Sequence, residues 1–199
     1  MIPDNSFINF GGITTSFCDS SRSSIIIFFA GCPYRCSWCH NKNLWNTKNY
    51  INIDVVKNLI AENSEFVSEV IFSGGEPGYQ PEALIELLKY TKGLGLLSGI
   101  ETSGYNSFRL IPAFESNLID FIYLDFKTSP YKYDEVTHYA FSFDGVETMM
   151  TLCKEFNISC ELRITQVPEI ISESIISQIK YLANVFGFSY KIQEMGTLK

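Results

Sequence analysis

Short apolar runs recur along the chain at intervals that leave room for a helix between one run and the next. Continuous apolar runs of this length, bounded by polar or turn residues, are typical of strands that are covered on both faces. The sequence therefore predicts six buried strands: Ile25–Phe29, Val70–Phe72, Leu97–Ile100, Phe121–Leu124, Ile158–Ile164 and Phe188–Gln193.

Segments with helical spacing of apolar residues separate these runs. The predicted helices are Pro81–Lys92, a helix that starts at Asp144, Ser174–Phe186 and, with weaker periodicity, Asp54–Ala61 and Ser107–Phe114. Proline in the first turn supports the helix at Pro81. Glu147, three residues after Asp144, suggests a variant of the capping box at that helix start.

Alternation of strands and helices indicates a parallel sheet with helical crossovers, so the fold class is α/β. Six units in 199 residues are fewer than the eight of a complete barrel, which takes about 250 residues. We expect a single domain over residues 1–199, with its core at about 24–193, that forms a partial (β/α)6 barrel. An open doubly wound sheet is the alternative, and periodicity does not separate the two.

Composition and charge restrict the partners of this chain. Apolar residues make up 46% of it and aromatic residues 15%, which is typical of a globular protein. The formal net charge of −7 is unfavourable for binding to nucleic-acid phosphates. The N-terminus does not resemble a signal peptide, and the longest apolar run, Ile25 to Ala30, is too short to cross a bilayer. We expect a cytoplasmic protein without a nucleic-acid or membrane partner.

The segment GCPYRCSWCHN concentrates three cysteines, Cys32, Cys36 and Cys39, in the spacing C-x3-C-x2-C. In a reducing compartment such a group indicates metal or redox chemistry and not disulfides. A zinc site with His40 as fourth ligand is one interpretation, although His40 directly follows Cys39. Three thiolates on a [4Fe–4S] cluster are the other, because the iron without a thiolate can bind a substrate.

The three remaining cysteines do not belong to this group. Cys153 lies on the apolar face of a predicted helix, which indicates a core position. Cys160 lies in a predicted strand, and Cys18 in a loop before the first strand.

Polar residues follow or end each predicted strand. The cysteine segment follows the first strand, Ser73-Gly-Gly-Glu-Pro the second, Glu101-Thr-Ser-Gly the third and Asp125-Phe-Lys the fourth, while Arg163 and Gln193 lie in the last two. The carboxyl ends of parallel strands meet at one edge of the sheet, where α/β proteins bind their ligands. We therefore expect one polar site at this edge.

These motifs together resemble the radical S-adenosylmethionine (SAM) enzymes, in which C-x3-C-x2-C, here with Trp38 before the last cysteine, is followed by GGEP. The segments GCPYRCSWCHNKNLW, FIYLDFKTSPYKYDEVT and ELRITQVP resemble the glycyl-radical-enzyme activating enzymes, over residues 24–193. The resemblance implies a [4Fe–4S] cluster held by the three cysteines, and SAM bound at the open iron. It also implies cleavage of SAM to a 5′-deoxyadenosyl radical.

The resemblance assigns expected roles to residues that match the family's motifs. The predicted SAM-binding residues are Trp38, Gly74, Gly75, Glu76, Glu101, Thr102, Ser103, Asp125, Lys127 and Arg163. Backbone carbonyls at Gly74 and Gly75 are expected to hold the methionine ammonium, and Glu76 to shape the loop. Lys127 and Arg163 are candidates for the methionine carboxylate.

The function implied is that of an enzyme that removes a hydrogen atom from a glycine of a large partner enzyme. The pattern is most similar to the activating protein of anaerobic ribonucleoside-triphosphate reductase, with the pyruvate formate-lyase type as the alternative. A reducing donor such as flavodoxin or ferredoxin is then required. Two further readings remain: a radical SAM enzyme acting on a small molecule, similar to 7-carboxy-7-deazaguanine synthase, and a metal-binding module without catalysis.

Overall fold

One sheet of eight strands organises the part of the chain that the computed structural model describes, residues 6–16 and 22–194. The order of strands across the sheet is β3-β1-β2-β4-β5-β6-β7-β8. Their bounds are β1 Phe7–Ser16, β2 Ser24–Phe29, β3 Tyr50–Asn52, β4 Glu69–Gly74, β5 Leu97–Thr102, β6 Phe121–Asp125, β7 Ser159–Gln166 and β8 Ser189–Glu194.

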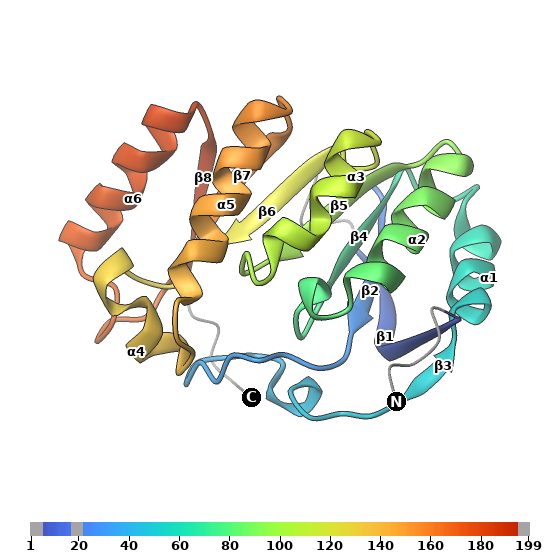
Figure 1. The fold of residues 1–199 in the computed structure, drawn as a ribbon, viewed down its shortest axis with the longest axis horizontal. Helices are drawn as coiled ribbons and strands as arrows, with labels where there is room; N and C mark the ends of the chain where they lie inside the picture. Colours follow the sequence, from blue (N-terminus) through green and yellow to red (C-terminus); the bar gives the residue numbers. More distant parts are fainter. Residues whose placement is uncertain (1–5, 17–21, 195–199) are drawn as a thin grey trace.

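The strands β2, β4, β5, β6, β7 and β8 run parallel and correspond to the six predicted ones. Their order along the sheet never reverses, whereas a doubly wound sheet reverses at a switch point. The main helices accordingly lie on one face of the sheet (Figure 1). The prediction of an α/β fold with a partial barrel is therefore confirmed, and the doubly wound alternative is wrong.

Two strands were not expected from the sequence. β1 pairs antiparallel with β2 and with β3, and so extends the parallel sheet at its first edge. The register of β1 shifts between Phe10 and Gly12, which is a β-bulge. Asn9 in this strand accepts the backbone N–H of Ala30 at 2.8 Å, so β1 also supports the start of the loop that follows β2.

All five predicted helices are present. The α-helices are α1 Ile53–Asn63, α2 Pro81–Gly93, α3 Ile111–Glu115, α4 Tyr133–Thr137, α5 Ser142–Glu155 and α6 Glu173–Phe186, and short 3-10 turns are η1 Lys42–Leu44, η2 Pro77–Tyr79, η3 Ser107–Leu110 and η4 Pro130–Lys132. The predicted capping box at Asp144 is wrong, because α5 begins two residues earlier. The Asp134 carboxylate of α4 caps it instead, accepting the N–H groups of Phe141 and Ser142 at 2.9 Å.

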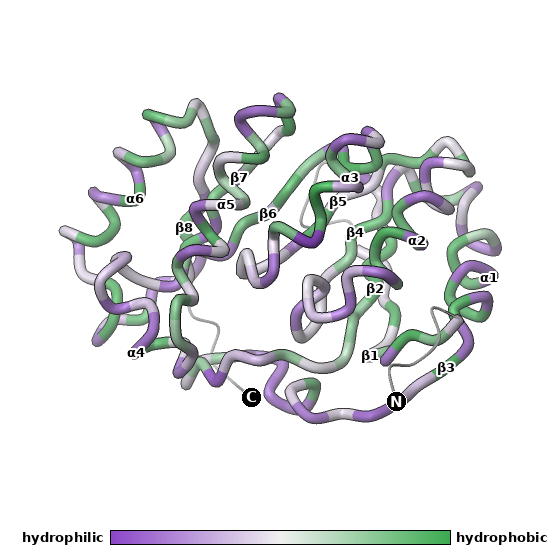
Figure 2. Tube along the Cα trace, in the orientation of Figure 1, coloured by the Kyte–Doolittle hydropathy of each residue, from purple (hydrophilic) through white to green (hydrophobic). Residues whose placement is uncertain are grey.

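Two clusters of buried apolar residues include residues of the sheet. The larger core lies between the sheet and the helices and contains Cys153, as predicted, and Cys160. A small cluster of Ile26, Ile71 and Phe121 lies apart from that core. Figure 2 shows hydrophobic residues along the strands, whereas the segment that crosses below the sheet is mainly hydrophilic. Cys18 lies outside the described residues, and no described helix has the length and apolar character of a membrane span.

Candidate active site

A cavity of about 450 Å³ lies at the carboxyl ends of the parallel strands. Its lining residues come from the loop after β2 and from the ends of β4, β5, β6, β7 and β8: Cys32, Tyr34, Cys36, Trp38, Cys39, His40, Asn41, Trp45, Ser73, Gly74, Gly75, Glu76, Glu101, Thr102, Ser103, Asp125, Lys127, Thr165, Gln193 and Glu194. The polar segments that the sequence placed after separate strands therefore surround one space.

The loop that carries the three cysteines is closed by backbone hydrogen bonds between its ends. The N–H of Gly31 donates to the carbonyl of Leu44 at 2.7 Å, and the N–H of Cys32 to that of Trp45 at 3.3 Å. Inside the loop, Arg35 Nη1 donates to the carbonyls of Cys32 and Tyr34 at 2.6 and 2.7 Å. These contacts fix the backbone on both sides of the first two cysteines.

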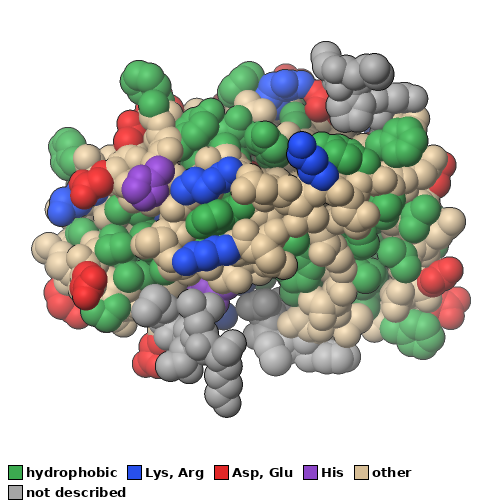
Figure 3. All heavy atoms as spheres, turned by 90° about the horizontal axis from the view of Figure 1, so that it is seen from below, with side chains coloured by type: hydrophobic (Ala, Val, Ile, Leu, Met, Phe, Trp, Pro, Cys, Tyr) green, Lys and Arg blue, Asp and Glu red, His purple; other side chains and the backbone are tan. Residues whose placement is uncertain are grey.

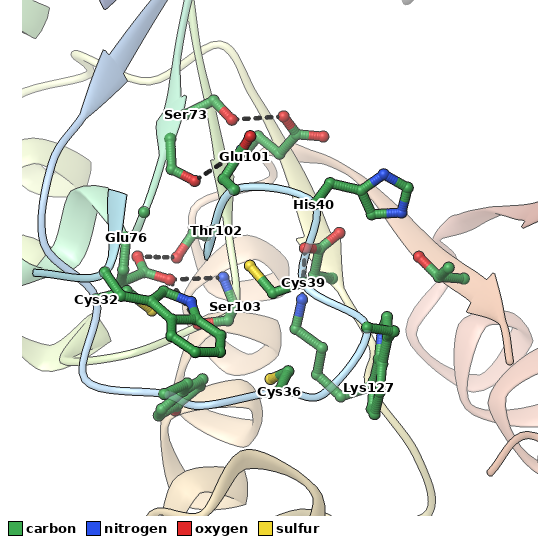
Figure 4. A pocket seen from close by; sticks show the side chains of 18 of the residues that line it. Cys32, Cys36, Cys39, His40, Ser73, Glu76, Glu101, Thr102, Ser103 and Lys127 are labelled. Carbon is green, nitrogen blue, oxygen red and sulfur yellow. Dashed lines mark hydrogen bonds and ion pairs between the residues drawn. The ribbon is translucent and has the colours of Figure 1, made fainter. Parts of the chain in front are cut away.

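The three cysteine side chains point into the same cavity, and the His40 ring extends away from them (Figure 4). Burial raises the pKa of the Cys32 thiol to about 12, and the nearby Glu76 carboxylate adds to the shift. Burial also raises the pKa of Cys36. Among residues 6–16 and 22–194, no three His, Cys, Asp or Glu side chains are grouped to hold one metal ion.

Gly74 and Gly75 allow the chain after β4 to approach the backbone of the cysteine loop. A Cβ atom on Gly74, whose φ is +119°, would lie 2.4 Å from the backbone nitrogen and oxygen of Phe29. A Cβ on Gly75 would lie 2.3 Å from the carbonyl oxygen of Gly31. The two glycines therefore permit close contact between the chain after β4 and the start of the cysteine loop. The Gly74 carbonyl also accepts Asn41 Nδ2 at 3.2 Å.

Glu76 is fully buried and joins the loop after β4 to the end of β5. Its Oε1 accepts the N–H of Gly78 at 2.9 Å and the hydroxyl of Thr102 at 2.6 Å. Its Oε2 accepts the N–H of Ser103 at 2.9 Å and the Ser103 hydroxyl (Figure 4). Burial raises the pKa of Glu76, and these hydrogen bonds oppose the shift. Both carboxylate oxygens of Glu76 are therefore engaged in hydrogen bonds within the protein.

Asp125 and Lys127 form an ion pair at the end of β6, with 2.7 Å between Lys127 Nζ and Asp125 Oδ2. Burial alone would lower the pKa of Lys127, but the charges of Asp125 and Cys36 outweigh it and raise the pKa. The turn is held by Tyr133 of α4, whose hydroxyl accepts the N–H of Lys127 at 2.8 Å and donates to the Asp125 carbonyl at 3.2 Å. The Lys127 charge therefore lies beside the cysteines.

Arg163 occupies a different position from the other predicted residues. It is 2% exposed and is not among the described residues that line the cavity. Its Nη1 contacts Glu101 Oε1 at 2.7 Å, its Nε contacts Glu161 Oε1 at 3.0 Å, and its guanidinium carbon lies 3.5 Å from the Tyr123 ring centre. The other Glu101 oxygen accepts the Ser73 hydroxyl at 2.7 Å. Arg163 therefore supports Glu101 from behind the cavity wall.

Several lining residues were not selected as site residues from the sequence: Tyr34, Asn41, Trp45, Ser73, Thr165 and Glu194. Asn41 ends the GCPYRCSWCHN segment and Ser73 begins the SGGEP segment. Their positions in these motifs could have indicated that they line the site. Thr165 lies two residues after Arg163 in β7, and alternation along a strand could have indicated it. Trp45 is brought to the cavity by the hydrogen bond between its carbonyl and the N–H of Cys32. No pattern in the sequence around Trp45 indicates that contact.

The residues present fit a [4Fe–4S] cluster with SAM beside it. Three thiols from one loop line one cavity, and no fourth cysteine lines it among the described residues, so one iron would lack a thiolate. Glu101 and Asp125 add carboxylates opposite the loop, and Lys127 is the single Lys or Arg in the described lining. A cavity with this excess of acidic groups suits a ligand with positive sulfonium and ammonium groups.

Comparison with known proteins identifies the class. The sequence profile of the radical SAM superfamily matches residues 26–180. The chain therefore belongs to the radical SAM superfamily of enzymes. Within the superfamily it groups with the activating enzymes of glycyl-radical enzymes. A Methanocaldococcus jannaschii protein assigned as such an enzyme is 30% identical over 163 residues, which are 79% of this chain and 67% of that protein.

Other relatives match shorter segments. The pyruvate formate-lyase-activating enzyme of Clostridium pasteurianum is 41% identical over 40% of this chain and 36% of its own. The anaerobic ribonucleoside-triphosphate reductase-activating protein of Enterobacteria phage T4 is 26% identical over 38% of this chain and 52% of its own. The structure of Streptococcus suis SuiB bound to precursor peptide SuiA superposes with a TM-score of 0.68 at 16% identity, over 86% of this chain and 39% of SuiB, which shows a shared fold.

Proposed function

We propose that this chain binds a [4Fe–4S] cluster and SAM in the cavity and removes a hydrogen atom from a glycine of a partner enzyme. The observation that carries the proposal is the joint lining of one cavity by the three cysteines and by polar groups from five strand ends. A bound cluster supplies the electron that cleaves SAM to methionine and a 5′-deoxyadenosyl radical. The remaining tasks fall to the chain's own residues.

Cys32, Cys36 and Cys39 would hold three irons as thiolates, and the hydrogen bonds of Arg35 would keep their loop in place. The Gly74 carbonyl, at the end of β4, is available to a ligand ammonium if Asn41 yields its 3.2 Å hydrogen bond. Lys127 would neutralise the methionine carboxylate. Asp125, 2.7 Å from Lys127 Nζ, would hold the lysine ammonium in position. Thr102, Ser103 and Glu101 would border the ribose and methionine.

Aromatic side chains would keep water away from the reacting groups. Trp38 directly precedes Cys39, and Tyr34 lies two residues before Cys36. Both aromatic side chains are buried and line the cavity. Tyr34 is held by ring contacts to Tyr105 and Tyr139, with centroids 5.9 and 5.5 Å away. Exclusion of water protects a reactive carbon radical from side reactions.

Two partner enzymes are supported by the relatives, anaerobic ribonucleoside-triphosphate reductase and pyruvate formate-lyase. Similarity to the phage T4 activating protein supports the first, and similarity to the Clostridium pasteurianum enzyme supports the second. The resemblance of the sequence as a whole favours the reductase, with pyruvate formate-lyase as the alternative. A reduced flavodoxin or ferredoxin would supply the electron.

The test is anaerobic electron paramagnetic resonance on the cluster-loaded protein with reductant, SAM and each partner enzyme in turn, with 5′-deoxyadenosine quantified in the same tube. A glycyl-radical doublet with one partner is expected and identifies that partner. Formation of 5′-deoxyadenosine without a doublet from either would direct attention to a small-molecule substrate. Absence of SAM cleavage by protein with full iron content would contradict the proposed function.

A further inference from the structure

The cysteine loop differs in charge from the rest of the chain. The chain has 22 Asp and Glu in 199 residues, but residues 20–53 contain none. The same stretch contains four basic residues, Arg22, Arg35, Lys42 and Lys48. An acidic protein therefore has one long segment without negative charge, and that segment includes all three cluster cysteines.

Three of these cations lie on the loop itself, and we call Arg35, Lys42 and Lys48 the basic loop surface. Lys42 and Lys48 are exposed, and Arg35 is half-buried. Within residues 6–16 and 22–194 these three form no ion pair. By contrast, six other described basic residues contact carboxylates: Arg22, Lys57, Lys92, Arg109, Lys127 and Arg163.

The neighbouring helix does not neutralise this surface. α4 contacts the loop through the Arg35 N–H, which donates to the Thr137 carbonyl at 2.8 Å. The Asp134 carboxylate of α4 accepts N–H groups at the start of α5 and not a cation. In Figure 3, which shows the molecule from the side of this loop, Lys and Arg side chains lie near the middle of the face and the acidic side chains lie mainly towards its rim.

The basic loop surface is also the outer side of the predicted cluster site. Ser37, between Cys36 and Cys39 in the chain, is exposed, while Cys36 is 6% exposed and faces the cavity. Arg35 Nη1 bonds the Cys32 carbonyl at 2.6 Å, and its Nη2 bonds Asn46 at 3.0 Å on the exposed side. A protein docked here would be separated from the cysteines by one layer of chain, without entering the cavity.

Resting on the proposed function, we infer that the basic loop surface is the docking site of an acidic one-electron donor protein. Complementary charge selects such a partner and accelerates its encounter. One electron leaves the reduced prosthetic group of the donor, which is oxidised by one equivalent, and enters the cluster, which is reduced by one equivalent. No covalent bond forms or breaks at the interface. The glycine of the substrate enzyme must instead enter the cavity, so it needs a different approach.

The experiment measures the rate of cluster reduction by anaerobic stopped-flow absorbance, with reduced flavodoxin and reduced acidic ferredoxin as protein donors. Reduced methyl viologen, a small cation, is the control reductant. The test variant is Lys42→Glu/Lys48→Glu. The matched control is Lys89→Glu/Lys154→Glu, which makes the same charge change at exposed lysines of α2 and α5. Binding of each donor to the oxidised protein is measured in parallel as a function of salt.

In the test variant we expect at least one protein donor to bind more weakly and to reduce the cluster about ten-fold more slowly, with little remaining salt dependence. The control variant should keep most of the original rate, and reduction by methyl viologen should be unchanged in both variants. Equal effects in the two variants, or none in either, would contradict the inference. Loss of binding to the glycyl-radical enzyme instead of the donors would assign the surface to the substrate.

The two proposals fail separately. If methyl viologen supports glycyl-radical formation but neither acidic protein reduces the unmodified cluster, the docking inference is wrong and the proposed function stands. If methyl viologen reduces the cluster but SAM is not cleaved, the proposed function is wrong, and with it the inferred role of the donor.

Discussion

Replacement of Gly75 by alanine tests why the glycine pair is needed. The added Cβ would lie 2.3 Å from the Gly31 carbonyl oxygen, and contacts below 3.0 Å essentially do not occur, so the two segments must separate by about 0.7 Å. Two backbone hydrogen bonds cross this junction, from Gly75 to Phe29 at 2.7 Å and from Glu76 to Gly31 at 3.0 Å. Gly31 directly precedes Cys32, so the displacement also reaches the first of the three proposed cluster ligands.

The expected loss follows from those two bonds. A buried backbone group left without its partner costs about 1–3 kcal/mol, so loss of both bonds in Gly75→Ala should lower the free energy of unfolding by about 2–6 kcal/mol. The measurement is urea unfolding of the metal-free chain under reducing, anaerobic conditions. Gly93→Ala is the matched control, because a Cβ at the end of α2 meets nothing within 4 Å. It should change stability by no more than about 1 kcal/mol.

Metal-free protein separates the two explanations for the glycine. If Gly75→Ala were as stable as Gly93→Ala without cofactors and lost only SAM affinity, the glycine would be needed for cofactor approach. The argument from chain packing would then be refuted. Loss of stability in both the metal-free and the loaded protein would support it.

Three further substitutions distinguish ligands from supports. Cys36→Ser should reduce bound iron to less than about half, because a cluster with two thiolates is poorly held, and normal iron content would contradict its role. Lys127→Met should raise the Kd for SAM about ten-fold with iron retained, as measured by equilibrium dialysis; equal affinity would exclude a contact with the carboxylate. Arg163→Met should destabilise even the metal-free chain by about 3 kcal/mol in urea, because Glu101 and Glu161 lose their shared cation. Unchanged stability would contradict that role.

Strands β2, β4, β5 and β6 could be predicted because each is a largely buried apolar run, whereas most residues of β8, at the edge of the sheet, are exposed. β1 and β3 could not be predicted, since β1 has Gly11-Gly12 in its middle, a bulge after Phe10 and little alternation of buried and exposed residues. Its place in the sheet depends on antiparallel pairing with β2, which is a property of the partner strand. The start of α5 was misplaced for a similar reason, because its cap, Asp134, comes from another helix.

The positions of the site residues were easier to predict than their individual contacts. The rule that carboxyl ends of parallel strands meet at one edge brought together nearly the whole predicted set, from Cys32 to Lys127. It does not state which atoms of that set remain available to a ligand. Glu76 uses both oxygens inside the protein, and the Gly74 carbonyl is already bonded to Asn41. Those contacts depend on loops from three different strands.

Arg163 illustrates the limit most clearly. A charge within a strand indicates a polar partner, and the family resemblance implied the methionine carboxylate as that partner. The structure provides two protein carboxylates, Glu101 and Glu161, and stacks the guanidinium on Tyr123. Since Glu101 lines the cavity and is held between Arg163 and Ser73, its carboxylate is oriented before any ligand binds. Arg163, which lies two residues before the cavity-lining Thr165 in β7, can therefore influence the site without touching the ligand.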